Sequence, residues 1–96
     1  MFYMRKRLEL HHIAGRNNSG MTVSLCVSCH KEITRHQNTW DIRWTHQDNT
    51  ETLQNAFIMQ GIRELLLLKY VKTGDYTYYC LADSLCYAIG KSLAIE

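Results

Sequence analysis

Three of the five histidines fall within twenty residues of one another, and a Cys-x-x-Cys pair lies between them. The histidines are His11, His12 and His30, and the cysteines are Cys26 and Cys29. Imidazole and thiolate groups are the usual protein ligands of zinc and of the later transition metals. The stretch from Leu8 to Gln37 therefore predicts a metal site, which the rest of the fold has to support.

Two paired strands are expected on either side of a polar turn. Alternation predicts a first strand from Tyr3 or Arg7 to Ile13, and residues 22–25 have the composition of a returning strand. Residues 14–20 between them are rich in glycine and asparagine, as turns are. Period-two alternation assigns Glu9, His11 and Ile13 to one face of the first strand, and Leu8, Leu10 and His12 to the other. The adjacent histidines therefore point in different directions, which suits one as a metal ligand and the other as a base.

Residues 26–29 are expected to form a tight knuckle, from which Ser28 caps a helix that runs through His30 to Gln37. This order of hairpin, knuckle and helix resembles the HNH, or ββα-metal, endonucleases. The residues that carry the resemblance are His11-His12-Ile13, Gly15-Arg16-Asn17-Asn18 and Leu25-Cys26-Val27-Ser28-Cys29-His30, about a third of the chain. The resemblance implies an N-terminal ββα-metal unit.

The resemblance to HNH endonucleases also implies a role for each histidine. His11 falls at the first metal-ligand position, His12 at the general base, and His30 at the ligand that opens the helix. The implied activity is hydrolysis of a phosphodiester bond in DNA with one divalent ion. Two histidines with water suit Mg²⁺, Mn²⁺, Ni²⁺ or Zn²⁺, and imidazole favours the later transition metals.

The sequence departs from the family pattern at two positions of the site. The asparagine that orients the base in the family is replaced by Met21, so we expect Asn17 or Asn18, or alternatively Thr22, to take that role. Four residues after His30, where the family often has a further ligand, this chain has Thr34. These departures keep a second function open, that of a catalytically degenerate HNH-fold module that binds nucleic acid without cutting it.

Two interpretations fit Cys26 and Cys29. They are candidate ligands of a structural zinc ion, which needs four ligands and therefore a distant cysteine, a histidine or a second chain. Alternatively, they are small apolar side chains buried at the end of a strand. Cys80 and Cys86 are six residues apart and diverge on their predicted helix, so this pair is not expected to complete a zinc site.

Positive charge is concentrated in the half of the chain that carries the histidines. Residues 1–44 hold seven lysines and arginines against three acids, whereas residues 45–96 hold four against six. Cations that bracket a metal site fit a nucleic acid ligand, although such charges also occur on an ordinary solvated surface. The side chains expected to bind phosphates are Arg5, Lys6, Arg7, Arg16, Lys31 and Arg35.

After the first helix, polar and apolar residues alternate over residues 38–46, which predicts an extended segment. Its two tryptophans, Trp40 and Trp44, are expected to cover the core.

A helical hairpin is expected to follow this segment. Asp48 and Glu51 have the spacing of a capping box at the start of a long helix that ends near residue 72. Residues 73–75, Thr-Gly-Asp, are expected to end this helix and to cap a last one over residues 76–94. Gly61 and Gly90 inside these helices predict close crossings.

These segments predict a single α+β domain over residues 1–96, with a ββα-metal unit at 1–46 and a two-helix hairpin at 47–96. Because the hairpin has more apolar surface than the small unit can cover, we expect a homodimer through it, with Leu66 and Leu68 near its centre. A protein–protein adaptor that uses the hairpin is a third functional class. The sequence has neither an apolar leader nor an uninterrupted apolar run of ~20 residues, which predicts a cytoplasmic protein that does not cross a membrane.

Overall fold

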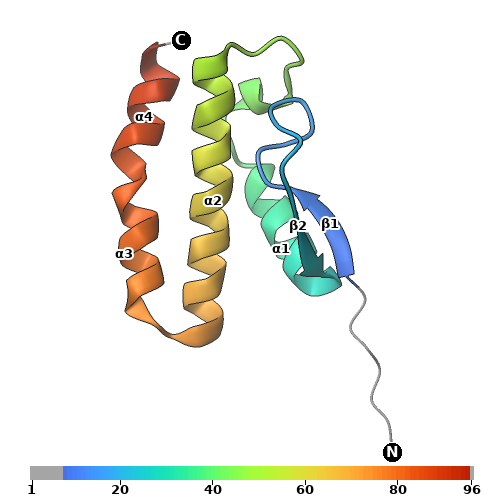
Figure 1. The fold of residues 1–96 in the computed structure, drawn as a ribbon, viewed down its shortest axis with the longest axis vertical. Coiled ribbons are helices and arrows are strands. Elements are labelled where there is room, and N and C mark those ends of the chain that lie inside the picture. The colour runs from blue at the N-terminus through green and yellow to red at the C-terminus, as the bar shows by residue number, and fades with distance from the viewer. Residues whose placement is uncertain (1–7, 96) are drawn as a thin grey trace, which may run out of the picture.

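The computed structural model describes residues 8–95, which form an antiparallel hairpin followed by helices (Figure 1). The elements are β1 (Leu8–His12), β2 (Thr22–Cys26), α1 (Val27–Gln37), the 3₁₀ helix η1 (Ile42–Thr45), α2 (Glu51–Thr73), α3 (Tyr76–Ser84) and α4 (Cys86–Ile95). The predicted α+β class, with an N-terminal ββα unit and a helical hairpin, is confirmed. The segment before Leu8, where the first strand was expected to begin, lies outside the described residues.

The hairpin is closed by a turn that requires glycine. Strands β1 and β2 pair antiparallel, with His11 opposite Val23. In the turn, Gly15 has a left-handed backbone with a φ angle of 86°. The ring of Trp44 lies against it, so that an added Cβ would be 2.6 Å from a ring carbon. Gly15 is therefore needed both for its backbone conformation and for space.

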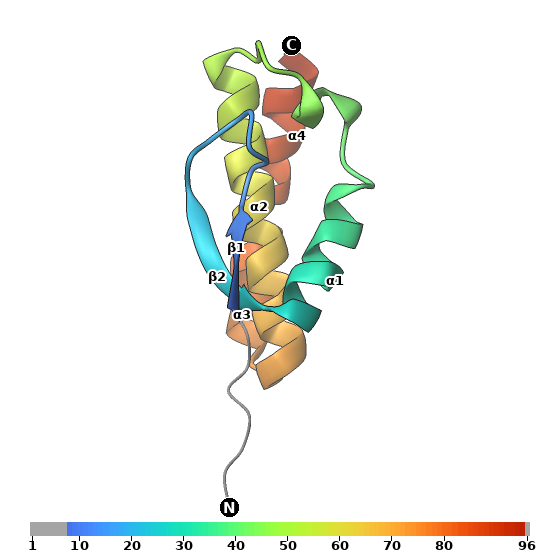
Figure 2. The same cartoon turned by 90° about the vertical axis from the view of Figure 1, so that its right-hand side faces the viewer.

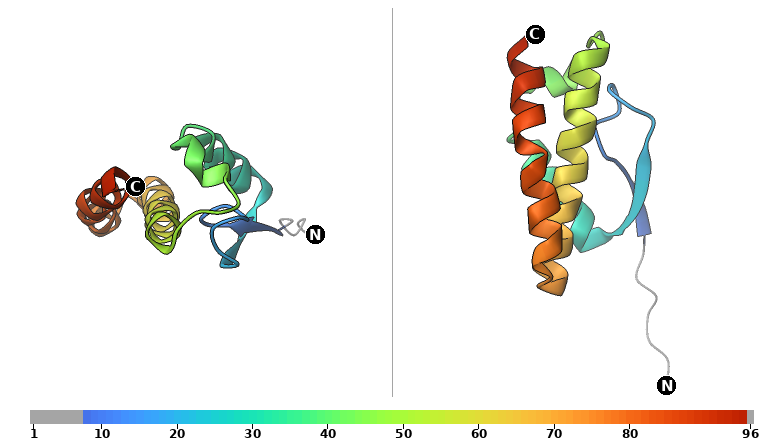
Figure 3. Two further views of the ribbon diagram at one scale, coloured as in Figure 1. Left: turned by 90° about the horizontal axis from the view of Figure 1, so that it is seen from above. Right: turned by 60° about the vertical axis from the view of Figure 1, so that its left-hand side comes forward.

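Helix α2 is the central element, because the other parts of the chain pack on it. Seen from above, α3 and α4 lie on one side of α2 and the ββα unit lies on the other (Figure 3). Figure 2 shows the hairpin and α1 together against α2. The four consecutive leucines at residues 65–68 point to different sides of α2. A helix with apolar residues around its whole circumference is stable when neighbouring segments cover several of its faces, as they do here. None of the helices within residues 8–95, α2 included, combines the length and apolar character that crossing a bilayer requires.

The end of the first strand approaches α2 very closely at Gly61. A Cβ at Gly61 would be 1.8 Å from the backbone carbonyl oxygen of Ile13. A close approach at Gly61 is therefore present, but the segment that approaches is the end of the first strand and not another helix, as the crossing prediction had it. The same prediction for Gly90 is wrong, because nothing lies within 4 Å of the position of its Cβ.

The aromatic core lies where the segment after α1 packs on α2. The rings of Trp40 and Phe57 are stacked with centroids 6.1 Å apart, and Trp44 meets Trp40 edge-on at 5.7 Å. The tryptophans therefore cover the core as expected. The extended conformation predicted for this segment is wrong, because Asp41 accepts the backbone N–H of Arg43 and begins the 3₁₀ helix η1.

An ion pair in η1 also reaches α4. Arg43 donates from Nε and Nη2 to the two carboxylate oxygens of Asp41, at 3.0 and 2.8 Å. Its Nη2 also donates to the backbone oxygen of Leu93 at 3.1 Å. The side-chain hydrogen bond from Arg43 is the main cause that lowers the pKa of Asp41 to about 2.

The helix ends follow local signals, with two corrections. Helix α2 is capped by Thr50, whose hydroxyl accepts a backbone N–H of the first turn, and not by the predicted Asp48. It ends at Gly74, which has a left-handed φ of 73°, and Asp75 caps α3, both as predicted. The last helix was expected to be continuous, but it is interrupted at Leu85 and divides into α3 and α4.

Candidate functional site

The histidine site is formed where β1 faces α1. Because side chains alternate along a strand, Glu9 and His11 share the face of β1 that contacts the helix. His30 comes from the first half of α1 and meets this face. The His11 and His30 rings are edge-on, with centroids 5.4 Å apart. The structure thus brings together the two residues that were predicted as metal ligands.

His11 has an unsatisfied nitrogen in a buried position. The residue is 2% exposed, and its Nε2 atom has no hydrogen-bond partner among the described residues. The pKa of His11 is lowered to about 4, mainly by burial and to a smaller extent by the nearby His30 and His12. The ring is therefore neutral at pH 7. A buried polar atom without a partner costs about 1–3 kcal/mol, so such an atom calls for a ligand or a function.

His30 is held by a carboxylate, that of Glu9, which was not among the predicted site residues. Its Nδ1 atom lies 2.9 Å from Oε1 of Glu9, and both side chains are only partly exposed. A signal for this contact was present in the sequence, since Glu9 is two residues before His11 and hence on the same strand face. What the sequence did not reveal is that His30 packs against that face.

His12 lies at the end of β1 and is partly exposed. Alternation along β1 places its side chain on the face opposite to that of His11. Its backbone oxygen accepts hydrogen bonds from the amide of Gln37 at 3.2 Å and from the backbone N–H of Gly15 at 3.1 Å. The hairpin end is thereby tied to the end of α1, so the backbone of His12 has a defined position.

The prediction that Asn17 or Asn18 orients His12 is not supported by their contacts. Asn17 donates from Nδ2 to the backbone oxygen of Thr45 at 2.9 Å. Asn18 is buried and donates to the backbone oxygens of Ala14 and Trp44, at 2.8 Å each. Both amides therefore fasten the turn to η1 instead of reaching His12, because η1 folds back over the turn.

The cysteine knuckle begins α1. Cys26 is the N-cap residue, so the prediction that Ser28 caps this helix is wrong. The Sγ atom of Cys26 lies 3.4 Å from the hydroxyl oxygen of Ser28, and Cys26 and Cys29 are both partly exposed. Within residues 8–95, no three His, Cys, Asp or Glu side chains are gathered as a set of metal ligands. A structural zinc at Cys26 and Cys29 therefore stays a prediction that needs ligands from elsewhere.

An open groove of about 720 Å³ runs along α1 beside His30. Lys31 and Arg35, one helical turn apart on α1, are exposed and line it. Arg35 also forms an ion pair with Glu32 at 2.6 Å. Arg16 is exposed on the hairpin turn, whereas the predicted phosphate ligands at residues 5–7 lie outside the described residues. Lys31 and Arg35 are thus the predicted cations that adjoin the histidine site.

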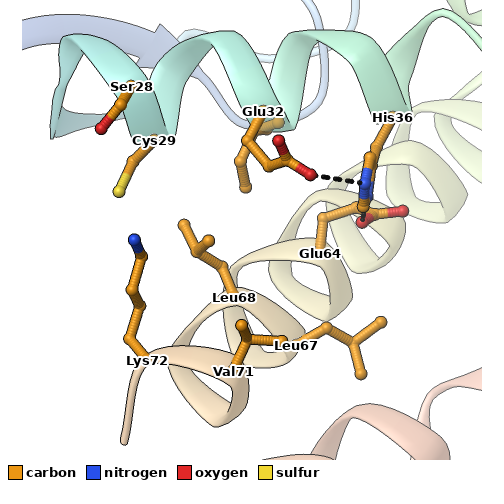
Figure 4. A pocket seen from close by; sticks show the side chains of 10 residues that line it. Ser28, Cys29, Glu32, His36, Glu64, Leu67, Leu68, Val71 and Lys72 are labelled. Atoms are coloured by element: carbon orange, nitrogen blue, oxygen red, sulfur yellow. Dashed lines mark hydrogen bonds and ion pairs between the residues drawn. The ribbon is translucent and has the colours of Figure 1, made fainter.

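A second cavity, of about 280 Å³, separates α1 from α2 (Figure 4). His36 lies at one end of it, with Nδ1 2.8 Å from Oε2 of the buried Glu64 and Nε2 3.5 Å from Oε1 of Glu32. Lys72 and Cys29 lie at the other end, with leucines of α2 between (Figure 4). Sequence patterns gave no signal for the His36–Glu64 pair, because the two residues are 28 positions apart and belong to different helices.

Comparisons of the chain with protein-family models, with curated proteins and with solved structures found no match.

Proposed function

We propose that this protein is a metal-dependent, HNH-like endonuclease that hydrolyses phosphodiester bonds in DNA. The observation that carries the proposal is the pair of imidazoles on facing elements, His11 and His30, whose ring centroids are 5.4 Å apart. The buried Nε2 atom of His11 has no hydrogen-bond partner among the described residues, which fits a nitrogen reserved for a ligand. Two imidazole nitrogens are a suitable donor set for a divalent ion of the later transition series.

Each histidine has one role in the proposed reaction. His11 and His30 hold the ion, for which Mg²⁺, Mn²⁺, Ni²⁺ and Zn²⁺ are the alternatives. When bound, a divalent ion supplies positive charge that stabilises the phosphate and the leaving oxygen in the transition state. His12 accepts a proton from the attacking water. As the oxygen of that water bonds to phosphorus, the bond between phosphorus and the leaving oxygen breaks.

DNA is proposed as the substrate because cationic side chains adjoin the histidines. Lys31 and Arg35 line the groove that His30 also lines, and Arg16 is exposed on the hairpin turn. Contacts between lysine or arginine and phosphate release counterions, so DNA binding should weaken steeply with salt. Replacing Lys31 by Gln should reduce the slope of log K against log salt by roughly 1. Binding that does not respond to salt would argue against a nucleic acid substrate.

The variant His12→Ala tests the catalytic assignment. We expect cleavage to fall by about 10²–10⁴-fold, while the affinities for metal and for DNA stay nearly unchanged, because the variant lacks only the base. His46→Ala is the matched control, since His46 is exposed and follows η1. Full activity of His12→Ala would remove His12 from the mechanism. If the wild type cleaves no DNA with any of the four ions, the proposed activity is refuted.

A second candidate function is a module of the same fold that binds nucleic acid without cutting it. One observation favours it: the amides of Asn17 and Asn18 are bonded to the backbone of residues 44 and 45, and neither orients His12. The position where the family has its orienting asparagine is Met21, which is exposed. Salt-dependent DNA binding without cleavage would support this candidate.

A further inference from the structure

Histidine can bind a metal through either ring nitrogen, and the hydrogen bond made by the other nitrogen decides which one is free. In His30, Nδ1 lies 2.9 Å from a carboxylate oxygen of Glu9. An ionised carboxylate only accepts hydrogen bonds, so the proton between them belongs to His30 Nδ1. The lone pair of a neutral His30 is therefore on Nε2.

Glu9 reaches His30 from the strand that also carries His11. The two residues are two positions apart on β1 and therefore share the face that meets α1. The side chains of Glu9 and His30 are 34% and 27% exposed, so water only partly screens their hydrogen bond. Strand β1 thus supplies both the proposed ligand His11 and the carboxylate of Glu9, which holds the second proposed ligand, His30.

A neighbouring carboxylate does not share this role. Glu32 lies two residues after His30 and lines the same groove. Its two oxygens, however, face Arg35 at 2.6 Å and His36 at 3.5 Å. Removing the charge of Glu32 would therefore change the local electrostatics without breaking a hydrogen bond to His30.

We propose that Glu9 is a positioning residue that fixes the tautomer and the ring orientation of His30, so that Nε2 is presented for metal binding. This inference rests on the proposed function, because it takes His30 to be a metal ligand. Carboxylates that orient a ligating histidine typically contribute 10–100-fold to metal affinity. The effect of Glu9 is therefore measurable apart from any cleavage of DNA.

The first experiment reads the tautomer in the metal-free protein. ¹⁵N-edited NMR of the histidine rings should show the proton of neutral His30 on Nδ1 in the wild type. In Glu9→Leu the acceptor is lost, and the proton should redistribute towards Nε2. Glu9→Gln retains a carbonyl acceptor and should keep the wild-type tautomer. Glu9→Thr, which is a good strand former, replaces Glu9→Leu if that variant does not fold.

The second experiment measures affinity for Co²⁺ and Zn²⁺ by calorimetry and by the absorption of bound Co²⁺. We expect Glu9→Leu to bind about 10–100-fold more weakly, and Glu9→Gln to be closer to the wild type. Glu32→Gln is the matched control, which removes one charge from the groove and should leave both the affinity and the His30 tautomer unchanged.

The outcomes separate this inference from the proposed nuclease activity. If Glu9→Leu keeps the wild-type tautomer and affinity, the role of Glu9 is overturned whether or not the protein cleaves DNA. If Glu9→Leu changes both, the inference is supported even when the wild type binds metal without cleaving DNA. If the wild type binds neither Co²⁺ nor any of the four proposed ions, the metal site itself is overturned, and the role of Glu9 falls with it.

Discussion

Replacing Gly61 by alanine should destabilise the protein, because the added methyl group meets backbone. The Cβ atom would lie 1.8 Å from the carbonyl oxygen of Ile13 and 2.5 Å from its carbonyl carbon. Contacts under 3.0 Å are essentially never seen for Cβ atoms, so α2 and the end of β1 would have to separate by at least about 1.2 Å. A peptide group cannot rotate away from such a contact as a flexible side chain can.

The size of the effect follows from two opposing terms. Overpacking of a well-packed site costs about 1–3 kcal/mol, and a clash with backbone belongs at the upper end. Alanine is better than glycine inside a helix by about 1 kcal/mol, which offsets part of this loss. We therefore expect a net destabilisation of about 2 kcal/mol. For a domain of this size, that lowers the Tm by roughly 8–16 °C.

Thermal and urea unfolding followed by circular dichroism would measure this difference. Gly90→Ala is the matched control, because Gly90 also lies inside a helix but nothing is within 4 Å of its Cβ position. It should be stabilised by up to about 1 kcal/mol. If Gly61→Ala were as stable as Gly90→Ala, the close contact between β1 and α2 would be refuted, and with it the packing that supports the histidine site.

Two further predictions concern pH and assembly. The pKa of Asp41 is lowered from 3.8 to about 2, so its ionised form stabilises the fold above pH 4 and this contribution is lost as the pH falls towards 2. Because Asp41 is partly exposed, we expect a loss of about 1 kcal/mol, and unfolding of Asp41→Asn should lack this part of the pH dependence. We also expect a homodimer through the helical hairpin, where Tyr87 is 78% exposed on α4 and Leu81 is 49% exposed on α3. Light scattering at tens of micromolar should give twice the chain mass of 11.3 kDa for the wild type and the monomer mass for Leu81→Lys; a wild-type monomer would contradict the expectation.

The predicted dimer interface changes in one respect once the packing is known. Leu66 and Leu68 were expected near the centre of the interface. Leu68 instead lines the cavity between α1 and α2 (Figure 4), and Leu66 is only partly exposed on α2. The large exposed apolar side chains of the hairpin lie mostly on α3 and α4. A test of dimerisation should therefore change residues of these two helices.

Local signals in the sequence were sufficient for the elements that depend on neighbouring residues. The hairpin turn, a helix that runs through His30 to Gln37, the end of α2 at Gly74 and the cap of α3 at Asp75 were predicted from spacing and composition. Each of these features is decided within a few residues, because turns and caps satisfy backbone groups with adjacent side chains or with a left-handed glycine. Strand alternation also correctly assigned His11 and His12 to opposite faces of β1.

Contacts between distant segments were decided only by the tertiary structure. The sequence did not reveal that His30 packs against Glu9, that Asn18 bonds to the backbone of residue 44, or that Gly61 but not Gly90 touches another segment. The amide of an asparagine or the carboxylate of a glutamate can reach many partners, and composition does not choose among them. The choice is made when α2 is covered on one side by the ββα unit and on the other by α3 and α4, since that packing decides which side chains face each other.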